Sequence, residues 1–261
     1  MPVAKVRGEN LHYEDSGGSG LPIVLSHGFL MDGEMFDAQV RALRGSHRVI
    51  TWDQRGHGRT AAAPVPWTLW DSAEDLTGLL DSLGIDRAAI GGMSQGGFIA
   101  LRFALAHPER TAALILIDTQ SGREDPDKAV QYDVMHDVWV TSGPNDQLVE
   151  MVASIIVGNH RPESAAWIAK WRARDPETLT PIYRTLMDRD DITSRIGEID
   201  APALVIHGTE DVSIDITLAD QLCAGLPGCR GVVRIEGAGH ASNQTHPEPV
   251  NRAIEEFLAG L

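Results

Sequence analysis

Short apolar runs rich in valine and isoleucine alternate along this chain with longer stretches whose apolar residues recur at helical spacing. The runs lie at residues 23–25, 48–52, 88–92, 114–117, 203–206 and 231–235. Such runs are typical of strands buried on both faces, and strands that alternate with helices form a parallel sheet covered by helices. The sequence therefore predicts an α/β fold with a mostly parallel sheet.

The first residues of the chain follow a different pattern. Residues 3–6 and 10–14 resemble strands, and a glycine- and serine-rich turn at residues 16–20 precedes the first buried run. Because these strands lack the intervening helix that a parallel connection needs, we expect them to form an antiparallel edge.

The alternation stops between residues 119 and 199. Four helical pieces are expected there, at residues 126–141, 145–158, 162–174 and 176–189, separated by glycines and prolines. We therefore expect a core of residues 1–119 and 200–261 with a helical cap, residues 120–199, inserted between strands. Because ligands of open α/β sheets bind beyond the carboxyl ends of the strands, the cap should cover a pocket as a lid.

Large apolar side chains mark the expected pocket. The residues assigned to it are Met31 and Met93 of the core and Met135, Trp139, Trp167, Trp171 and Met187 of the cap. Taken singly, each cap side chain is also explained by packing between helices. Together they favour a small to medium, mainly apolar substrate.

The segment Gly92-Met93-Ser94-Gln95-Gly96 matches the pattern G-x-S-x-G. The pattern alone is weak evidence, but here an expected strand ends at Gly92 and a helix begins near Gly96. Ser94 would then lie on a sharp strand-to-helix turn that exposes its hydroxyl. The N-terminus of the helix adds N–H groups and partial positive charge, which suit an anionic tetrahedral intermediate. We predict that Ser94 is a nucleophile.

A serine hydroxyl needs a base at neutral pH, and the chain has ten histidines. His240 fits best, because it lies in a glycine-rich loop between the last expected strand and a terminal helix. His27, His107 and His207 are more simply explained as hydrogen-bonded structural residues. We therefore predict that His240 takes the proton of Ser94.

The imidazole of such a base is oriented by a buried carboxylate. Asp211, which follows the next-to-last expected strand, is the best candidate, with Glu210 and Asp118 as alternatives. The backbone N–H groups of Gln95 and Phe29 are predicted to form the oxyanion hole, since Gln95 follows the nucleophile and Phe29 lies in the loop after the first buried strand.

Five motifs in this order resemble the signatures of the α/β-hydrolase superfamily and cover nearly the whole chain outside the cap. They are Ser26-His27-Gly28-Phe29, the segment 53–60 (DQRGHGRT), Gly92-Met93-Ser94-Gln95-Gly96-Gly97, His207-Gly208-Thr209-Glu210-Asp211 and Gly237-Ala238-Gly239-His240. The resemblance implies an α/β-hydrolase fold with an eight-stranded, mostly parallel sheet and a cap inserted after the sixth strand. It also implies an acyl-transfer site without metal or other cofactor, and a mainly structural role for Asp53, Arg55 and His57. Thr60 stands where serine is common in the family.

The same resemblance narrows the activity. A serine nucleophile disfavours epoxide hydrolases and haloalkane dehalogenases, which carry aspartate at this position. Capped esterases, enol-lactonases, N-acyl-homoserine lactonases, cofactor-free haloperoxidase-type perhydrolases and C–C bond hydrolases remain. We predict a serine hydrolase that cleaves a carboxylic ester or lactone through an acyl-enzyme on Ser94. The alternative from another class is a receptor with a hydrolase fold, which would bind its ligand without needing Ser94.

Charge and composition exclude other classes of protein. The 261 residues carry a formal charge of −15, which repels phosphate backbones and anionic lipid head groups. Apolar runs fall far short of a membrane-spanning helix, and the start of the sequence does not resemble a secretion signal. We expect a cytoplasmic monomer or homodimer that acts on a small molecule and binds neither nucleic acid nor membranes. Cys223 and Cys229 are accordingly expected to be free thiols.

Overall fold

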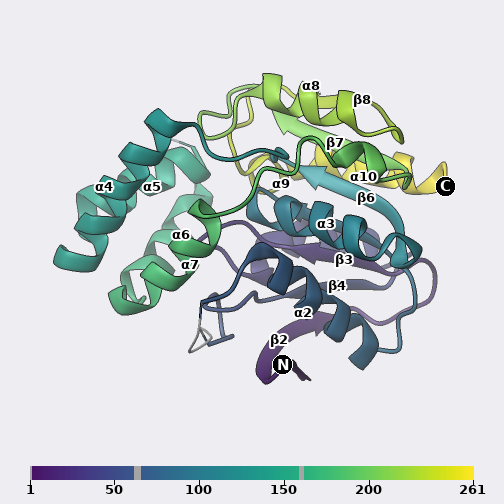
Figure 1. Ribbon diagram of the computed structural model, residues 1–261, viewed down its shortest axis with the longest axis horizontal. Coiled ribbons are helices and arrows are strands. Elements are labelled where there is room, and N and C mark those ends of the chain that lie inside the picture. The colour runs from purple at the N-terminus through teal and green to yellow at the C-terminus, as the bar shows by residue number, and fades with distance from the viewer. Residues whose placement is uncertain (1, 62–65, 159–161) are drawn as a thin grey trace.

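An eight-stranded sheet crosses the molecule in the order β1-β2-β4-β3-β5-β6-β7-β8 (Figure 1). Its strands are β1 (Val3–Val6), β2 (Glu9–Asp15), β3 (Ile23–Ser26), β4 (Val49–Trp52), β5 (Ala88–Met93), β6 (Thr111–Ile117), β7 (Ala203–Gly208) and β8 (Cys229–Ile235). The computed structural model describes residues 2–61, 66–158 and 162–261. β1 pairs with β2, and β2 with β4, in antiparallel fashion, whereas the pairs from β4 to β8 are parallel. The predicted sheet and its antiparallel edge are confirmed.

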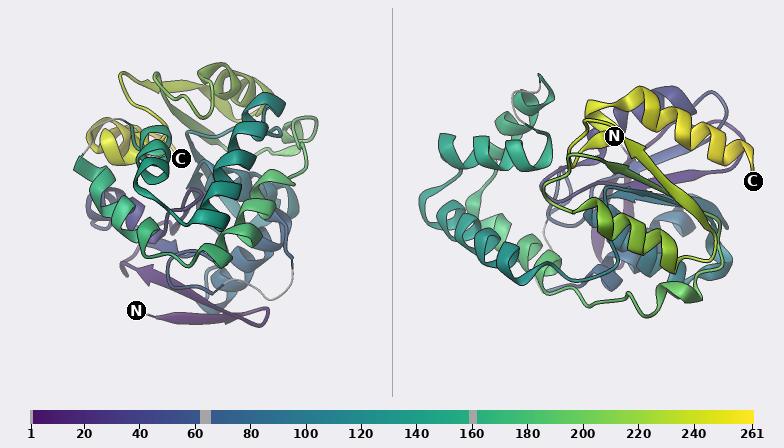
Figure 2. Two further views of the ribbon diagram at one scale, coloured as in Figure 1. Left: turned by 90° about the vertical axis from the view of Figure 1, so that its left-hand side faces the viewer. Right: turned by 90° about the horizontal axis from the view of Figure 1, so that it is seen from above.

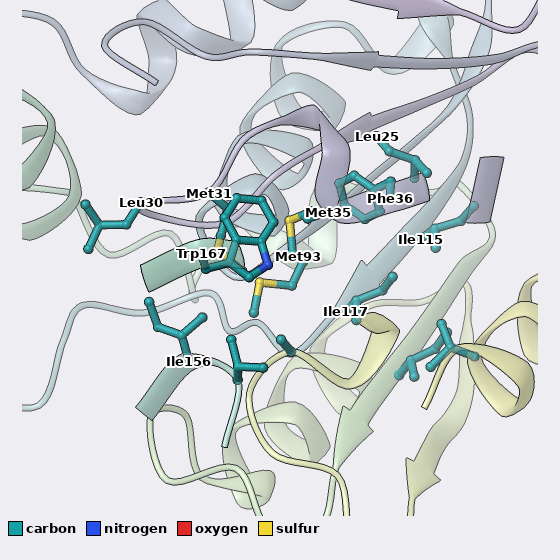
Figure 3. Close-up of a cluster of buried hydrophobic side chains, with 14 of the residues drawn as sticks. Leu25, Leu30, Met31, Met35, Phe36, Met93, Ile115, Ile117, Ile156 and Trp167 are labelled. Carbon is teal, nitrogen blue, oxygen red and sulfur yellow. The ribbon is translucent and has the colours of Figure 1, made fainter. Parts of the chain in front are cut away.

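Helices cover both faces of the sheet, which explains why its central strands read as continuous apolar runs. One face packs against α2 (Leu69–Ser82), α3 (Gln95–Ala106) and α8 (Ile216–Gly225), and the other against α1 (Asp37–Leu43), α9 (Ser242–Thr245) and α10 (Pro247–Ala259). Successive side chains of a strand alternate between the two faces. In β6, for example, Ile115 and Ile117 join one buried cluster (Figure 3), while Leu114 and Leu116 join the other.

Local sequence signals set the ends of the core helices. α2 begins at a capping box, in which the Thr68 hydroxyl accepts the N–H of Asp71 and the Asp71 carboxylate accepts the N–H of Thr68. α3 ends just before His107-Pro108, since proline cannot continue a helix. These signals fix the lengths of the helices that pack on the sheet.

Four further helices lie between β6 and β7 and form what we call the helical insertion. They are α4 (Pro126–Ser142), α5 (Asp146–Ile156), α6 (Pro162–Arg172) and α7 (Leu179–Met187), with a short 3-10 turn at Pro176–Thr178. Figures 1 and 2 show them grouped beyond the end of the sheet toward which the arrows of β6 and β7 point. The insertion therefore stands at the edge where the carboxyl ends of the parallel strands meet.

Cys223 of α8 and Cys229 of β8 form a disulfide, with Cα atoms 5.3 Å apart. The expectation of free thiols is therefore wrong. That expectation rested on the compartment assumed for the chain, whereas the turn between α8 and β8 brings the two residues within bridging distance. Within the described residues, no helix combines the length and hydropathy that crossing a bilayer requires.

Candidate active site

Ser94 lies on a strained turn between β5 and α3. Its φ of 51° and ψ of −114° are rare for a residue with a side chain. The flanking glycines are required because a Cβ atom on Gly92 would meet the backbone of Gly96, and one on Gly96 would meet the carbonyl of Ser26. The Ser94 N–H donates to the Ile117 carbonyl at 2.9 Å. The close packing of strands and helix thus fixes the hydroxyl at the sheet edge.

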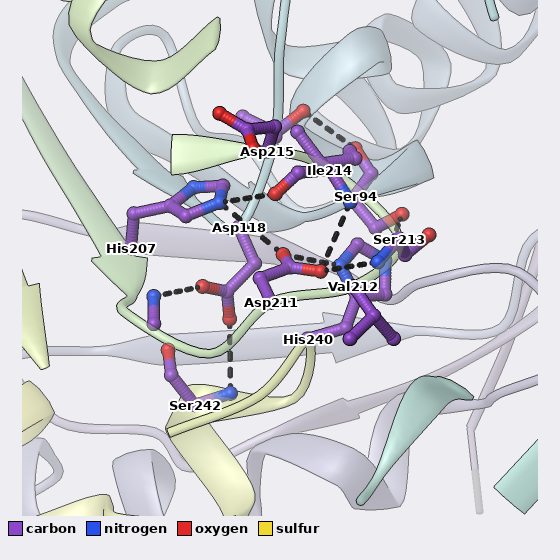
Figure 4. Close-up of polar contacts among 12 residues, drawn as sticks. Ser94, Asp118, His207, Asp211, Val212, Ser213, Ile214, Asp215, His240 and Ser242 are labelled. Carbon is purple, nitrogen blue, oxygen red and sulfur yellow. Dashed lines mark hydrogen bonds and ion pairs between the residues drawn. The ribbon is translucent and has the colours of Figure 1, made fainter. Parts of the chain in front are cut away.

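A chain of hydrogen bonds joins Ser94 to His240 and Asp211 (Figure 4). His240 Nε2 lies 2.9 Å from Ser94 Oγ, and His240 Nδ1 lies 2.8 Å from Asp211 Oδ2. Asp211 Oδ1 accepts the backbone N–H groups of Ser213 and Ile214 at 2.8 and 2.9 Å. The structure thus brings together, from the loops after β5, β7 and β8, the three side chains that the sequence analysis selected.

Burial and neighbouring charges shift the pKa values of Asp211 and His240 in opposite directions. Burial raises the pKa of Asp211, but the neighbouring His240 and His207 outweigh it and hold that pKa well below its usual range. Burial lowers the pKa of His240, but the Asp211 carboxylate outweighs it, so the pKa of His240 lies above its ordinary value. Asp211 therefore stays ionised at neutral pH and favours a positive charge on His240.

Asp118, the alternative acid, has a different part in the fold. It follows β6, and its two oxygens accept the N–H groups of Gly208 and Ser242, each at 2.9 Å. Burial raises the pKa of Asp118 to about 6. Asp118 thus joins the loops after β7 and β8, whereas the partner of His240 is Asp211. The other alternative, Glu210, is exposed to solvent.

The histidines set aside in the sequence analysis bond within the fold. His27 Nδ1 lies 2.8 Å from the Gly28 carbonyl, and His107 Nε2 lies 2.9 Å from a Glu74 oxygen. His207 Nε2 lies 2.8 Å from the Ile214 carbonyl and 3.2 Å from Asp211 Oδ2. His207 therefore supports the loop that carries Asp211, whereas the histidine that contacts the Ser94 hydroxyl is His240.

Asp118, His207 and Asp211 are the one group of donor side chains in the described residues whose spacing could suit a metal ion. Both oxygens of each carboxylate already accept hydrogen bonds from the protein. In Asp211 these bonds use both lone pairs of each oxygen, since Oδ1 accepts two backbone N–H groups and Oδ2 contacts both His240 and His207. The hydrogen bonds of the fold therefore account for this group.

Two backbone N–H groups beside Ser94 have no acceptor. Among the described residues, the amides of Phe29 and Gln95 donate to no protein atom. Gly28 lies close to the nucleophile, because a Cβ atom built on it would be 3.7 Å from Ser94 Cβ. The loop that carries Phe29 and the helix that begins at Gln95 therefore adjoin the same hydroxyl.

Gln54 links the loop that carries Phe29 to the start of α3, a contact that the sequence analysis missed. Its side-chain N–H donates to the His27 carbonyl, and its side-chain oxygen accepts from Gln95 Nε2, both at 2.6 Å. Its backbone N–H donates to His27 Nε2 at 3.0 Å. Gln54 belongs to the motif at residues 53–60, which was interpreted as structural. Membership of that motif is the one sequence signal that could have identified Gln54 as part of the site.

An apolar cavity of about 110 Å³ opens at Ser94 and His240. Five of the predicted pocket residues line it, namely Met31, Met93, Met135, Trp139 and Met187. Tyr132, His136 and Tyr183 of the insertion also line it but were not assigned to the site. Tyr183 lies on the strongly amphipathic α7, a pattern that could have identified it.

Trp167 and Trp171 do not line the cavity, so their assignment to the pocket is wrong. Both are buried on the face of α6 that packs on the core (Figure 3 labels Trp167 within the cluster). The Trp167 indole N–H donates to Gln244 Oε1 at 3.0 Å, and that of Trp171 to the Leu30 carbonyl at 2.8 Å. They attach the insertion to the core instead.

Few polar groups face the cavity. The Tyr132 hydroxyl lies 3.3 Å from that of Ser213. Glu124 is the one acidic residue among the described lining residues, and its carboxylate lies 3.3 Å from Arg189. The surface that would meet a substrate is therefore mainly apolar and carries little unpaired charge.

Several known proteins with similar sequences or structures are named as hydrolases. The family described as alpha/beta hydrolase fold matches residues 22–148. A Caulobacter vibrioides protein named as a carbamate hydrolase, RutD, is 30% identical over 272 residues, which cover 100% of this chain and 98% of the relative.

Two solved structures are also similar over nearly their whole length. A thermophilic esterase from Thermogutta terrifontis has a TM-score of 0.89 at 28% identity, covering 99% of this chain and 98% of that one. The enol-lactonase from Burkholderia xenovorans LB400 has a TM-score of 0.89 at 29% identity, covering 99% and 100%. The fold, the order of the motifs and these relatives lead to one conclusion. The chain is a hydrolase of the alpha/beta hydrolase superfamily.

Proposed function

We propose that this protein is a serine hydrolase that cleaves a small to medium, mainly apolar carboxylic ester or lactone. The observation that carries the proposal is the hydrogen-bonded chain from Ser94 through His240 to Asp211 at one end of an apolar cavity. A hydroxyl that is bonded to an imidazole, itself oriented by a carboxylate, is the arrangement that activates serine for attack on a carbonyl.

Acylation begins when Ser94 Oγ attacks the carbonyl carbon and His240 Nε2 takes the hydroxyl proton. The ionised Asp211 stabilises the resulting imidazolium. The free N–H groups of Phe29 and Gln95 donate to the oxyanion of the tetrahedral intermediate. When the intermediate collapses, the C–O bond to the alcohol breaks and His240 returns the proton to the leaving oxygen.

Deacylation repeats these steps with water. His240 takes a proton from a water molecule, whose oxygen attacks the carbonyl of the acyl-enzyme. The bond to Ser94 Oγ breaks, His240 returns the proton to that oxygen, and the acid is released. In a lactone the leaving alcohol stays attached to the acyl group, so the product is a hydroxy acid.

The helical cap, residues 120–199, selects the substrate in this proposal. Its residues Met135, Trp139 and Met187 form an apolar part of the cavity wall, and this surface favours hydrocarbon groups over charged ones. The formal charge of −15 disfavours an anionic substrate. The cap therefore decides between substrates that the core attacks by one mechanism.

A carbamate is the second candidate, because the full-length RutD relatives are named as carbamate hydrolases. Its carbonyl offers Ser94 the same kind of electrophile. The apolar lining of the cavity favours an ester or lactone with a hydrocarbon group over a small, polar carbamate. Perhydrolase and C–C bond hydrolase activities would use the same core, and hydrogen peroxide in the test addresses the first of them.

The test compares the wild type with Ser94→Ala. Substrates are p-nitrophenyl esters of increasing acyl length, aliphatic lactones and a p-nitrophenyl carbamate, with hydrogen peroxide as a competing nucleophile. We expect an optimum at a short or medium ester or lactone and a loss of about 10³-fold or more in the variant. A receptor would instead bind the ester without turnover, with equal affinity in both proteins. Turnover that depends on peroxide, or that survives in Ser94→Ala, would contradict the proposal.

A further inference from the structure

Leu30, which directly follows Phe29, has a left-handed backbone conformation with a φ of 62°. This conformation is unfavourable for an L-residue with a branched side chain, and a glycine would adopt it freely. The Leu30 side chain is 7% exposed and lines the cavity beside Ser94. Contacts from neighbouring elements must therefore hold the backbone in this position.

Trp171 of α6 provides such a contact. Its indole N–H donates to the Leu30 carbonyl at 2.8 Å, and its side chain is 1% exposed. The preceding residue, Lys170, pairs with Asp32 at 2.7 Å and Glu34 at 2.8 Å, just beyond the same loop. The insertion thus holds the downstream end of the loop that carries Phe29.

Gln54 holds the upstream end through its bonds to the carbonyl and ring of His27. The free Phe29 N–H therefore lies between two anchors, one from the core and one from the insertion. A backbone donor stabilises an oxyanion only when it points at the position where charge develops. The Gly28 carbonyl, in the same peptide plane as this N–H, accepts the Met31 N–H at 3.1 Å and lies 2.8 Å from His27 Nδ1, so the loop moves as a unit. Loss of either anchor lets this unit shift away from the oxyanion position.

We infer that Trp171 is a positioning residue, whose hydrogen bond to the Leu30 carbonyl holds in place the loop that aims the Phe29 N–H and so couples docking of the insertion to catalysis. The inference rests on the proposed function, because it requires an oxyanion at Ser94. It also explains why a conspicuous aromatic side chain of the insertion is buried away from the cavity.

Trp167 is a matched control on the same helix. It is 5% exposed, and its indole N–H also donates to the core, but to the Gln244 side chain on α9. Trp167→Phe and Trp171→Phe each remove one indole N–H and leave a similar space. A purely structural role would give the two variants the same kinetics.

The experiment measures kcat and KM with the best p-nitrophenyl ester, and inhibition by phenylboronic acid, which forms a tetrahedral adduct with serine. For Trp171→Phe we expect kcat to fall about 10-fold or more, with KM within about 2-fold, since misplacing a transition-state contact affects the chemical step. The boronic acid should bind about 10-fold more weakly. For Trp167→Phe both values should stay within about 2-fold of the wild type.

A second variant guards against misfolding. Replacing Trp171 by 3-benzothienylalanine keeps the bicyclic ring but puts sulfur in place of N–H, and it should reproduce the kinetics of Trp171→Phe. Equal kinetics for the Trp167 and Trp171 variants, or a benzothienyl variant with wild-type kcat, would overturn the inference and leave the proposed function intact. Ester hydrolysis that survives in Ser94→Ala would overturn both.

Discussion

The core and the helical insertion are built in different ways. In the core, α3 is buried along nearly its whole length, and backbone N–H groups bond to the Asp211 carboxylate. The Ser94 N–H bonds to Ile117, and the loop that carries His240 is joined to that of Asp211 by the bond from the Glu210 N–H to the Ala238 carbonyl. The insertion exposes large apolar side chains, including Val130 at 63%, Val134 at 58% and Met151 at 43%. It meets the core through side chains of α4, α6 and α7, such as Lys128, Trp171 and Thr185, which donate to backbone carbonyls of the core.

The two regions therefore serve different properties of an enzyme, the position of its reacting groups and the choice of its substrate. The reacting groups need fixed positions, and the sheet with its close-packed turns provides them. The choice of substrate needs a surface that fits one group among many, and the insertion supplies most of the apolar lining of the cavity. We therefore expect core substitutions to change the rate for every substrate, and substitutions of the insertion residues that line the cavity to change the preference among substrates.

The largest effect is expected from the two buried carboxylates of the core. Asp211→Asn should lower kcat/KM by about 10⁴-fold, because the amide cannot stabilise a charged His240. Asp118→Asn should lower it by less than about 10-fold, because Asp118 accepts only backbone N–H groups of neighbouring loops. Steady-state kinetics on two esters of different length check both values, with thermal unfolding to show that the variants fold. Similar losses in the two variants would mean that Asp118 also acts on the base.

The next effect is the dependence of the rate on pH. The base must be neutral, and the Asp211 carboxylate holds the pKa of His240 above its ordinary value. The value of kcat/KM should therefore fall on acidification through an inflection above about 6.5, with a loss of about 30-fold or more at pH 5. Recovery of activity after return to pH 8 separates protonation from unfolding. A profile that is flat from pH 5 to 8 would show that His240 is not the base.

Substitutions of the insertion residues that line the cavity should have smaller effects, and only on the preference among substrates. Met135→Ala and Met187→Ala enlarge the cavity, so each should raise kcat/KM for p-nitrophenyl octanoate relative to acetate by about 10-fold. Met151→Ala, on the exposed side of α5, is the control and should leave the ratio unchanged. If the methionine variants instead lowered the rate equally for both esters, the separation between core and insertion would fail.

The smallest effect concerns stability within the insertion itself. Val134→Thr should change the free energy of unfolding by less than about 0.5 kcal/mol, because the side chain is exposed. Val149→Ala, at a fully buried position of α5, should cost about 2 kcal/mol. Urea denaturation measures both. Equal costs would indicate that the exposed valines of α4 are covered in solution.

Sequence patterns predicted the core more fully than the insertion, for a physical reason. The strands and the turn at Ser94 depend on local rules of burial and glycine geometry, so their positions and the order of Ser94, Asp211 and His240 could be predicted. The helices of the insertion could be located, but periodicity does not show which neighbour a buried face meets. Trp139 faces the cavity, whereas Trp167 and Trp171 face the core.

Contacts that depend on how loops and turns are arranged could not be predicted from the sequence. The bonds of Gln54 to His27 and Gln95 depend on how three loops converge at the sheet edge. The disulfide between Cys223 and Cys229 depends on the turn that joins α8 to β8. Neither leaves a periodic pattern in the residues that form it.

The central claim is that the Ser94 hydroxyl is the one group that attacks the substrate, and covalent labelling tests it most directly. The protein is treated with limiting diisopropyl fluorophosphate, the site is mapped by mass spectrometry, and residual esterase activity is measured on each sample. We predict one adduct, on Ser94, with activity falling in proportion to the labelled fraction and no labelling in Ser94→Ala. Full activity in protein whose Ser94 is completely modified would contradict the account.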